Sequence, residues 1–433
     1  MTEQMNVPKL RFGEFSENWQ AIELGELMAF KNGINASKEQ YGRGVKFINV
    51  LDIIENDYIT YDRIVGSVDV EDKEFQKNIV EHGDILFQRS SETREDVGQA
   101  NVYLDEKKVA TFGGFVIRGK KIGEFDSICM NYLLKTDKAR KEVTTRSGGS
   151  TRYNVGQATL SAVNIHLPPS ISEQQKVASF LSKVDEKIAL LTEKKTKLTK
   201  YKKGVMQKLF NGKWQEQDGQ LTFIPPTLRF KADDGSEFPD WEEDKIGNNT
   251  EQLNGFAFKS EDLIEGQGDY PLMRGINITE GNIRHSIEMD RFYSGDISKL
   301  TKYILEEHDL VIGMDGSKVG KNIALVTSDD VGALLVQRVA RLRPKTNTSI
   351  MFIYQNIIAE KFRRYVDIVN TSSGIPHISK KQIDDYKIGF PCFDEQTKIA
   401  SFLSAIDKKI DLTNSELEKA KKWKKGLLQQ MFV

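Results

Sequence analysis

The chain has 433 residues, of which 39% are hydrophobic and 29% charged, and its net charge is −1. This is the size of two or three domains with a large polar surface, and no apolar run reaches the about 18–20 residues of a membrane span. The first residues lack the basic start and apolar core of a signal peptide. Cys129 and Cys392 stand at unrelated positions, which predicts reduced, buried thiols rather than a disulfide. We therefore expect a cytoplasmic protein with no membrane partner, and the total charge alone does not favour nucleic-acid binding.

The first body of the chain is predicted to consist mainly of short strands and turns. After a segment that contains Trp19, the Asn32-Gly33 pair predicts a turn whose glycine supplies a positive φ. Apolar and β-branched runs at residues 45–50 and 83–87, bounded by Gly, Asp and Asn, predict strands. A Gly- and Ser-rich loop at residues 147–154 then precedes a last strand. We expect an α+β body.

A long basic helix follows the first body. The small and acidic residues from Ser170 to Glu173 favour a helix start. From Glu173 to Phe210 the chain carries ten lysines against four acids. Apolar residues recur there with alternating spacings of three and four, which is the seam of a coiled coil. The residues assigned to the helix pair, and to a partner that docks on it, are Val177, Phe180, Leu181, Val184, Ile188, Leu191 and Leu198.

The chain then repeats itself 222 residues later. Residues 395–432 match residues 173–210 without a gap, and 19 of the 38 positions are identical. Trp19 and the Asn32-Gly33 pair return at the same offset. A period this long excludes a solenoid, whose repeats are about 20–50 residues, so the chain is a duplicated domain. In the second helix the assigned positions are Ile399, Phe402, Leu403, Ile406, Ile410, Leu417, Trp423 and Leu427.

The predicted order is a body at residues 1–170, a helix at 171–211, a polar linker at 212–225, a second body at 226–392 and a second helix at 393–433. A helix of 38 residues is about 57 Å long. If a two-fold axis relates the copies, the two helices form an antiparallel coiled coil with a body at each end. DNA half-sites one turn apart lie about 34–36 Å from each other, so these dimensions suit a bipartite site in duplex DNA. A helix pair that only joins two protein-binding bodies is the alternative.

The sequence carries no complete catalytic pattern. The stretch from Gly313 to Asn322 looks like a phosphate-binding loop, but its glycine spacing is wrong and no Ser or Thr follows its second lysine. Asp240, Glu243 and Asp244 stand close together, as carboxylates do in metal-dependent nucleases, but the first copy does not share this pattern. Five histidines and two cysteines lack metal-ligand spacing. We expect no catalytic residue, metal or cofactor in this chain.

The helix motif Glu-Gln-x-Lys-[Val/Ile]-Ala-Ser-Phe-Leu-Ser-x-[Val/Ile]-Asp-x-Lys-Ile, present twice, resembles that of the specificity subunits of bacterial type I restriction–modification enzymes. Residues 83–87 and the Ser/Gly-rich loop before the last strand share the resemblance, which covers the whole chain. It implies two target recognition domains that each read one part of a split, asymmetric double-stranded DNA site, with the helices setting the spacer. It also implies two modification subunits that methylate adenine with S-adenosylmethionine, and restriction subunits that use ATP and Mg²⁺.

The resemblance does not identify the residues that contact bases, so candidates come from side-chain chemistry. Hydrogen-bond donors on Gly-rich loops can reach phosphates and base edges. In the first body the candidates are Arg89, Arg94, Gln99, Arg146, Arg152 and Tyr153; in the second they are Arg274, Arg284, Ser317, Lys318, Lys321, Ser373 and His377. Two other functions stay open at this point: a non-catalytic two-domain protein-interaction scaffold, and a stand-alone nuclease or nucleotide-using enzyme.

Overall fold

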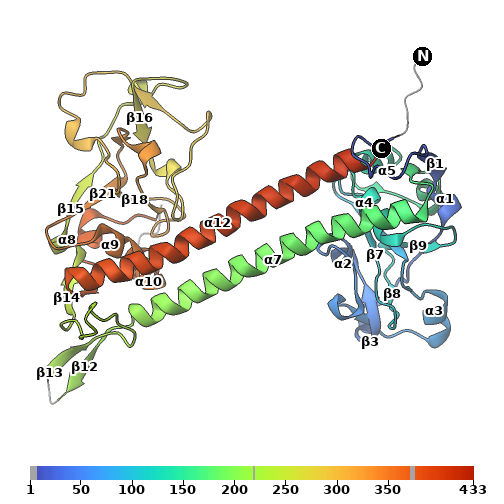
Figure 1. Ribbon diagram of the computed structural model, residues 1–433, viewed down its shortest axis with the longest axis horizontal. Helices are drawn as coiled ribbons and strands as arrows, with labels where there is room; N and C mark the ends of the chain where they lie inside the picture. The colour runs from blue at the N-terminus through green and yellow to red at the C-terminus, as the bar shows by residue number, and fades with distance from the viewer. Residues whose placement is uncertain (1–6, 218–219, 371–375) are drawn as a thin grey trace. The chain divides into compact units, whose positions relative to one another are not determined.

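The computed structural model describes residues 7–217, 220–370 and 376–433. Their contacts divide the chain into two units, one built from the residues up to Glu193 together with Asn414–Val433, the other from Lys194–Thr413. Each unit mixes helices and strands and contains one globular body with a part of each of the two long helices, α7 (Ile171–Leu209) and α12 (Phe393–Met431) (Figure 1).

The first unit is built on a four-stranded antiparallel sheet. Its strand order is β2 (Met28–Asn32), β9 (Val116–Lys121), β5 (Ile85–Gln88) and β7 (Ala100–Val102). Both faces of β5 are covered, because Ile85 and Phe87 enter one apolar core and Leu86 enters another. This explains why the strand is a continuous apolar run in the sequence rather than an alternating one.

Smaller sheets and short helices surround this sheet. Two-stranded sheets form from β1 (Gln20–Glu23) with β11 (Asn164–Leu167) and from β6 (Ser90–Ser91) with β10 (Tyr153–Asn154), and β4 (Ser67–Val68), β3 (Tyr41–Ile48) and β8 (Thr111–Phe112) make a three-stranded sheet. The helices are α1 (Leu24–Leu27), α2 (Val50–Ile54), α3 (Asp72–Lys77), α4 (Ser127–Leu134), α5 (Asp137–Thr145) and α6 (Gln157–Ser161), with 3₁₀ turns η1 (Lys38–Gln40) and η2 (Tyr61–Arg63).

The second unit repeats the four-stranded sheet, the three-stranded sheet and the β1–β11 pair, while a bridge between Asp315 and His377 stands in place of the β6–β10 pair. Its four-stranded sheet has the order β15 (Thr250–Asn254), β21 (Val339–Pro344), β18 (Leu310–Gly313) and β19 (Ile323–Leu325), β14 (Glu242–Lys245) pairs with β22 (Lys387–Phe390), and β17 (Phe292–Tyr293), β16 (Tyr270–Met273) and β20 (Leu334–Leu335) form the three-stranded sheet. The short helices are α8 (Ile246–Asn249), α9 (Ile350–Ile357), α10 (Glu360–Val369) and α11 (Lys380–Asp384), with 3₁₀ turns η3 (Ser260–Asp262), η4 (Gly275–Asn277), η5 (Thr301–Tyr303) and η6 (Ser328–Asp330).

Two segments differ from the sequence-based expectation. The segment expected to be a linker contains a hairpin of β12 (Lys213–Gln217) and β13 (Gln220–Ile224). The apolar stretch at residues 350–362 has helical spacing, which predicts a single helix, but extended backbone at Ala359 (φ −69°, ψ 155°) separates α9 from α10. This break lets Phe352 and Phe362 enter the same core.

The Asn-Gly pairs serve a purpose other than the predicted one. Neither Gly33 nor Gly255 has a positive φ, so the predicted left-handed turn is wrong. Each glycine instead allows a close backbone approach: a Cβ on Gly33 would lie 2.3 Å from the carbonyl oxygen of Gly113, and one on Gly255 would lie 2.1 Å from that of Val336. Both contacts leave room for no side chain at all.

Candidate nucleic-acid interface

Four backbone segments of the first body lie side by side at the end of the four-stranded sheet. The amide of Gly114 donates to the carbonyl of Ile34 (2.9 Å), and the amide of Arg89 donates to the carbonyl of Phe115 (2.9 Å). The amide of Val155 in turn donates to the carbonyl of Arg89 (3.0 Å), next to the β6–β10 pair. We call the segments 33–35, 113–115, 89–91 and 148–155 the first loop edge.

Three of the candidates from the first body are tied to this edge or to α5. Arg89 is half-buried, and its Nη1 donates to the carbonyl of Gly114 (3.2 Å). Arg94 is exposed and donates to the carbonyls of Thr144 and Thr145 at the end of α5 (3.1 and 3.3 Å). Tyr153 is half-buried in β10.

The other three have weaker local ties. Gln99 donates to Asp96 (3.0 Å), on the same connection as Arg94. Arg146 is exposed and pairs with Glu142 (2.7 Å). Arg152 is exposed and has no ion pair among the residues that the structure describes. Arg152 is therefore the most available cation of this set.

The second body builds the same arrangement. The amide of Gln337 donates to the carbonyl of Phe256 (2.7 Å), and the amide of Met314 donates to that of Arg338 (2.9 Å). The amide of Ile378 donates to the carbonyl of Met314 (2.8 Å). The segments 255–257, 336–338, 314–318 and 376–378 form the second loop edge, in which Met314 takes the place of Arg89 and Arg338 that of Phe115.

Most of the second body's loop candidates lie on or beside this edge. Ser317, Lys318 and Lys321 are exposed on the turn that follows β18, where Gly316 has a φ of 94°. His377 is exposed and bridges to Asp315 through the backbone. Ser373 lies outside the described residues.

Arg274 and Arg284 lie on a neighbouring loop and brace it. Arg274 donates through Nη1 to the carbonyl of Met289 (3.2 Å), and Arg284 donates through Nε to that of Ile276 (3.1 Å). This loop lies beside the second loop edge at Gly275, where an added Cβ would be 4.0 Å from Oδ1 of Asp315. These arginines already have backbone partners, and Arg284 is the more exposed.

His285 also holds this loop. Its Nε2 lies 2.9 Å from Oδ1 of Asp330 and its Nδ1 lies 3.3 Å from Oδ1 of Asp290. Burial works to lower the pKa of His285, but the hydrogen bond to Asp330 and the charge of Asp290 outweigh it and raise the pKa above its ordinary value. The protonated ring is thus favoured between two carboxylates.

Two residues of the loop edges were not among the sequence-based candidates. Phe115 is 65% exposed although it is a large apolar residue, and the side chain of Arg338 is also 65% exposed. Gly113-Gly114-Phe115 and Val336-Gln337-Arg338 have no residue in common, so the repeat held no residue-type signal for this position.

A buried ion pair anchors each long helix to its body. Arg11 donates to the two carboxylate oxygens of Glu173 (2.7 and 2.8 Å), and the indole of Trp19 donates to the same carboxylate (3.2 Å). Glu173 is only 1% exposed. In the second unit Arg229 and Trp241 bind Glu395 in the same way. The carboxylate also lies in the first turn of its helix, where a negative charge is favourable.

The glutamine that follows each anchoring glutamate joins two elements. Gln174 accepts from the amide of Asp126 (2.7 Å), the residue that caps α4, and donates to the carbonyl of Pro168 (2.8 Å). Gln396 does the same with Ser349, which caps α9, and Pro391. The repeated Glu-Gln pair thus fixes the start of the long helix against the body.

Within each unit the two long helices are joined by an equivalent ion pair. In the first unit Asp185 of α7 pairs with Lys424 of α12 (2.6 Å) and accepts from Tyr132 (2.7 Å). In the second unit Asp407 of α12 pairs with Lys202 of α7 (2.6 Å) and accepts from Gln355. Asp185 and Asp407 are equivalent positions of the repeat, 222 residues apart, and so are Lys202 and Lys424. The aspartate therefore comes from α7 and the lysine from α12 in the first unit, and the reverse holds in the second.

The residues assigned to the helix pair lie in three settings. Val177, Leu181, Val184 and Leu427 enter the core of the first body, with Phe180 and Ile188 packed against it; Ile399, Leu403 and Ile406 enter the core of the second body, with Phe402 and Ile410 packed against it; Leu191 and Leu417 form a small cluster with Ala420. Leu198 is half-buried and Trp423 is 48% exposed. Much of the predicted seam therefore binds each helix to a body as well as to its neighbour.

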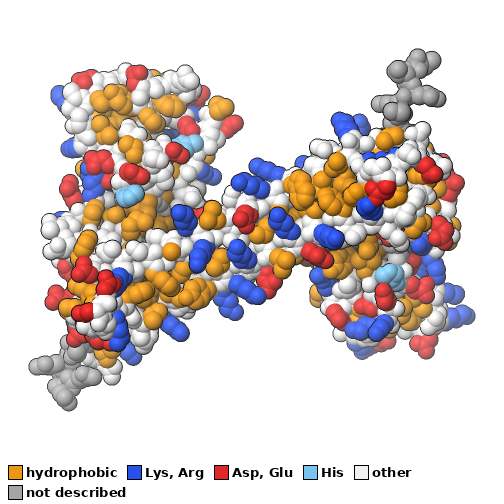
Figure 2. Space-filling view, in the orientation of Figure 1, with side chains coloured by type: hydrophobic (Ala, Val, Ile, Leu, Met, Phe, Trp, Pro, Cys, Tyr) orange, Lys and Arg blue, Asp and Glu red, His pale blue; other side chains and the backbone are white. Residues whose placement is uncertain are grey.

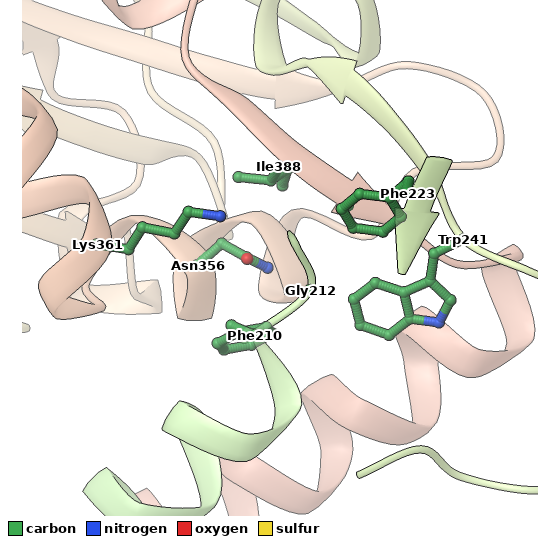
Figure 3. A pocket seen from close by; sticks show the side chains of 8 residues that line it. Phe210, Gly212, Phe223, Trp241, Asn356, Lys361 and Ile388 are labelled. Carbon is green, nitrogen blue, oxygen red and sulfur yellow. The ribbon is translucent and has the colours of Figure 1, made fainter. Parts of the chain in front are cut away.

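The surface features of the described residues give no sign of a small-molecule site. A pocket in the second unit, lined by Phe210, Trp241, Lys361 and their neighbours (Figure 3), has a volume of about 10 Å³, which is room for about one water molecule. No cluster of metal-ligating side chains and no helix able to span a membrane occurs among the described residues. Cys129 is buried and Cys392 half-buried, and both are free thiols.

Comparison with known proteins identifies a family that covers both copies of the repeat. The model of the type I restriction modification DNA specificity domain matches residues 16–200 and 239–422, one match for each copy of the repeat. The chain belongs to this family. The MjaVIII specificity subunit of a type I restriction enzyme from Methanocaldococcus jannaschii is 23% identical over 96% of this chain and 92% of its own length.

Solved structures from type I restriction–modification systems share the fold. The S subunit of a type I restriction–modification system from M. genitalium has a TM-score of 0.61 at 17% identity, with 99% of both chains covered. A chain from a study of complex assembly in the type I system has a TM-score of 0.53 at 14% identity, covering 96% of this chain and 97% of its own. The protein is thus a DNA-binding specificity subunit with two target recognition domains, and its role is recognition rather than catalysis.

Proposed function

We propose that each body reads one half of an asymmetric, bipartite site in double-stranded DNA, and that α7 and α12, running antiparallel as a pseudo-two-fold pair, set the spacer. The observation that carries this is the duplicated loop edge: one backbone arrangement presents Arg89 and Phe115 in the first body, and Met314 and Arg338 in the second. A common frame with different side chains suits two different base sequences.

Two modification subunits are the proposed partners of the helices. Leu190 and Trp423 of the first unit are 65% and 48% exposed, and Leu412 and Tyr201, their counterparts 222 residues away, are 57% and 55% exposed in the second. Exposed apolar residues that recur in both copies support two equivalent docking surfaces. Lysine side chains also lie along the exposed faces of α7 and α12 (Figure 2).

The chemistry is assigned to partner subunits. Modification subunits would transfer a methyl group from S-adenosylmethionine to adenine, and restriction subunits would use ATP and Mg²⁺ to translocate and cleave DNA. This assignment rests on membership of the specificity family, whose role is recognition. The proposed location is the cytoplasm, where the DNA lies.

Methylation mapping tests the recognition role. The chain is expressed with its modification subunit, and the host genome is sequenced for N6-methyladenine. We expect a motif of two short fixed sequences around a constant gap. A stable complex that produces no new motif would instead support the two-domain protein scaffold.

The docking surfaces are tested by stoichiometry. Leu190→Glu and Leu412→Glu should each reduce the modification subunits bound from two to one, measured by native mass spectrometry. Val65→Glu and Ile287→Glu are the matched controls, because Val65 and Ile287 are 90% and 88% exposed apolar residues of the bodies. Two subunits retained in both helix variants would place the docking surface elsewhere.

A further inference from the structure

The turn that carries Phe115 and Arg338 occupies the same place in both loop edges. In the first body the amide of Val116 donates to the carbonyl of Gly113 (2.8 Å), and in the second the amide of Val339 donates to that of Val336 (3.2 Å). Phe115 and Arg338 are each the third residue of these four-residue turns. The amide of Arg89 donates to the carbonyl of Phe115, and the amide of Met314 donates to that of Arg338. The backbone of this third residue is therefore held by the neighbouring segment of the edge in both bodies.

The second body holds Arg338 in an unusual conformation. Its φ is 67°, in the left-handed region that glycine and asparagine adopt most easily. Phe115 has no such strain. An arginine kept where a glycine would fit better points to a use for its guanidinium.

The guanidinium of Arg338 is both exposed and oriented. Its Nη1 lies 2.7 Å from Oδ2 of Asp315, while 65% of the side chain stays open to solvent. Asp315 follows β18, in the same edge as Lys318 and beside His377. One carboxylate can hold one side of the planar fork and leave the other donors free, which is the arrangement that bidentate contact with a guanine requires.

We propose that this turn position determines base specificity in each half-site: Arg338 reads the N7 and O6 edge of a guanine, and Phe115 contacts the methyl group of a thymine. Asp315 is a positioning residue for Arg338. The inference rests on the proposed function, since it names the residues by which the two bodies read different sequences from one frame.

The test compares variants of the full chain in complex with its modification subunits. Methylated motifs are mapped in the host, and binding is measured on DNA libraries randomised in each half-site. For Arg338→Ala and Arg338→Lys we expect guanine preference at one position of one half-site to fall by roughly 5- to 150-fold, with the other half unchanged. Phe115→Ala should relax a thymine in the opposite half only.

Two further variants separate recognition from folding and from charge. Arg338→Gly removes the strained backbone, so it should melt at or above the wild-type temperature and still lose the guanine preference. Arg364→Ala is the matched control, because Arg364 is a 73% exposed arginine paired with Glu360 (2.6 Å) in the same unit. It should leave both half-sites unchanged. An unchanged motif in the Arg338 variants would overturn this inference, whereas a wild-type complex with no bipartite motif would overturn the proposed function itself.

Discussion

Removing the carboxylate of Glu173 should destabilise the first unit strongly. In Glu173→Ala the guanidinium of Arg11, which is 10% exposed, keeps only its bond to the carbonyl of Glu17 (2.7 Å), and the buried indole of Trp19 loses its acceptor. Breaking a buried ion pair costs about 3–5 kcal/mol. At about 2–4 °C per kcal/mol for a unit of this size, the melting temperature should fall by about 6–20 °C.

Differential scanning calorimetry of the full chain, with hydrogen exchange to identify the unit that opens, measures this effect. Glu395→Ala should open the second unit in the same way, because Arg229 and Trp241 repeat the anchor. Lys176→Ala, on the same helix as Glu173, removes an exposed pair with Glu14 and should cost less than about 1 kcal/mol. A Glu173→Ala chain that melts within about 1 °C of wild type would show that the anchor does not stabilise the unit.

Four other outcomes are expected. His285→Gln should lower the stability of the second unit most near pH 6 and least near pH 8.5. The raised pKa of His285 gives a stabilisation that is complete below the unfolded pKa of about 6.5 and is lost as the pH rises through the pKa of the folded protein. Because the ring is half exposed, the effect is limited to about 1 kcal/mol, and a difference in melting temperature that does not change with pH would contradict the mechanism. Gly33→Ala should cost about 1–3 kcal/mol in urea unfolding, whereas Gly426→Ala, a helical position with open space, should stabilise by about 0.5–1 kcal/mol; equal effects would rule out the close approach. A double-mutant cycle on Asp185 and Lys424 should give a coupling of about 1 kcal/mol, and a value near zero would remove the pair from the account. Inserting about four residues in phase near Lys194–Lys197 should lengthen the DNA spacer by about a base pair in methylation mapping, and altered half-sequences would contradict the helix-spacer mechanism.

The duplication made much of the fold predictable. The strand expected at residues 83–87 corresponds to β5, and the last strand expected after the loop at residues 147–154 corresponds to β11, because short apolar runs between turn residues need no tertiary information. The repeated Trp19 and its counterpart were visible as anchors, but their partner was not, since Glu173 is 154 residues away and looked like an ordinary helix-start residue. Local patterns identify such residues without showing what they bind.

The failures have physical causes as well. Gly33 was assigned to a left-handed turn because Asn-Gly usually forms one, while its actual role is set by the backbone of Gly113, which only the fold brings near. Phe115 and Arg338 were missed because they are equivalent through hydrogen-bonded position rather than through residue type. Helical spacing across residues 358–359 hid the break between α9 and α10.

The interleaved composition of the units has a consequence for biosynthesis. Leu427, Met431 and Phe432 belong to the core of the first body, yet they leave the ribosome after the whole second body has been made. The first body therefore emerges with part of its apolar surface uncovered, and it can complete its core only after the second body has been synthesised. Translation order thus makes the body that is synthesised first the one that is finished last.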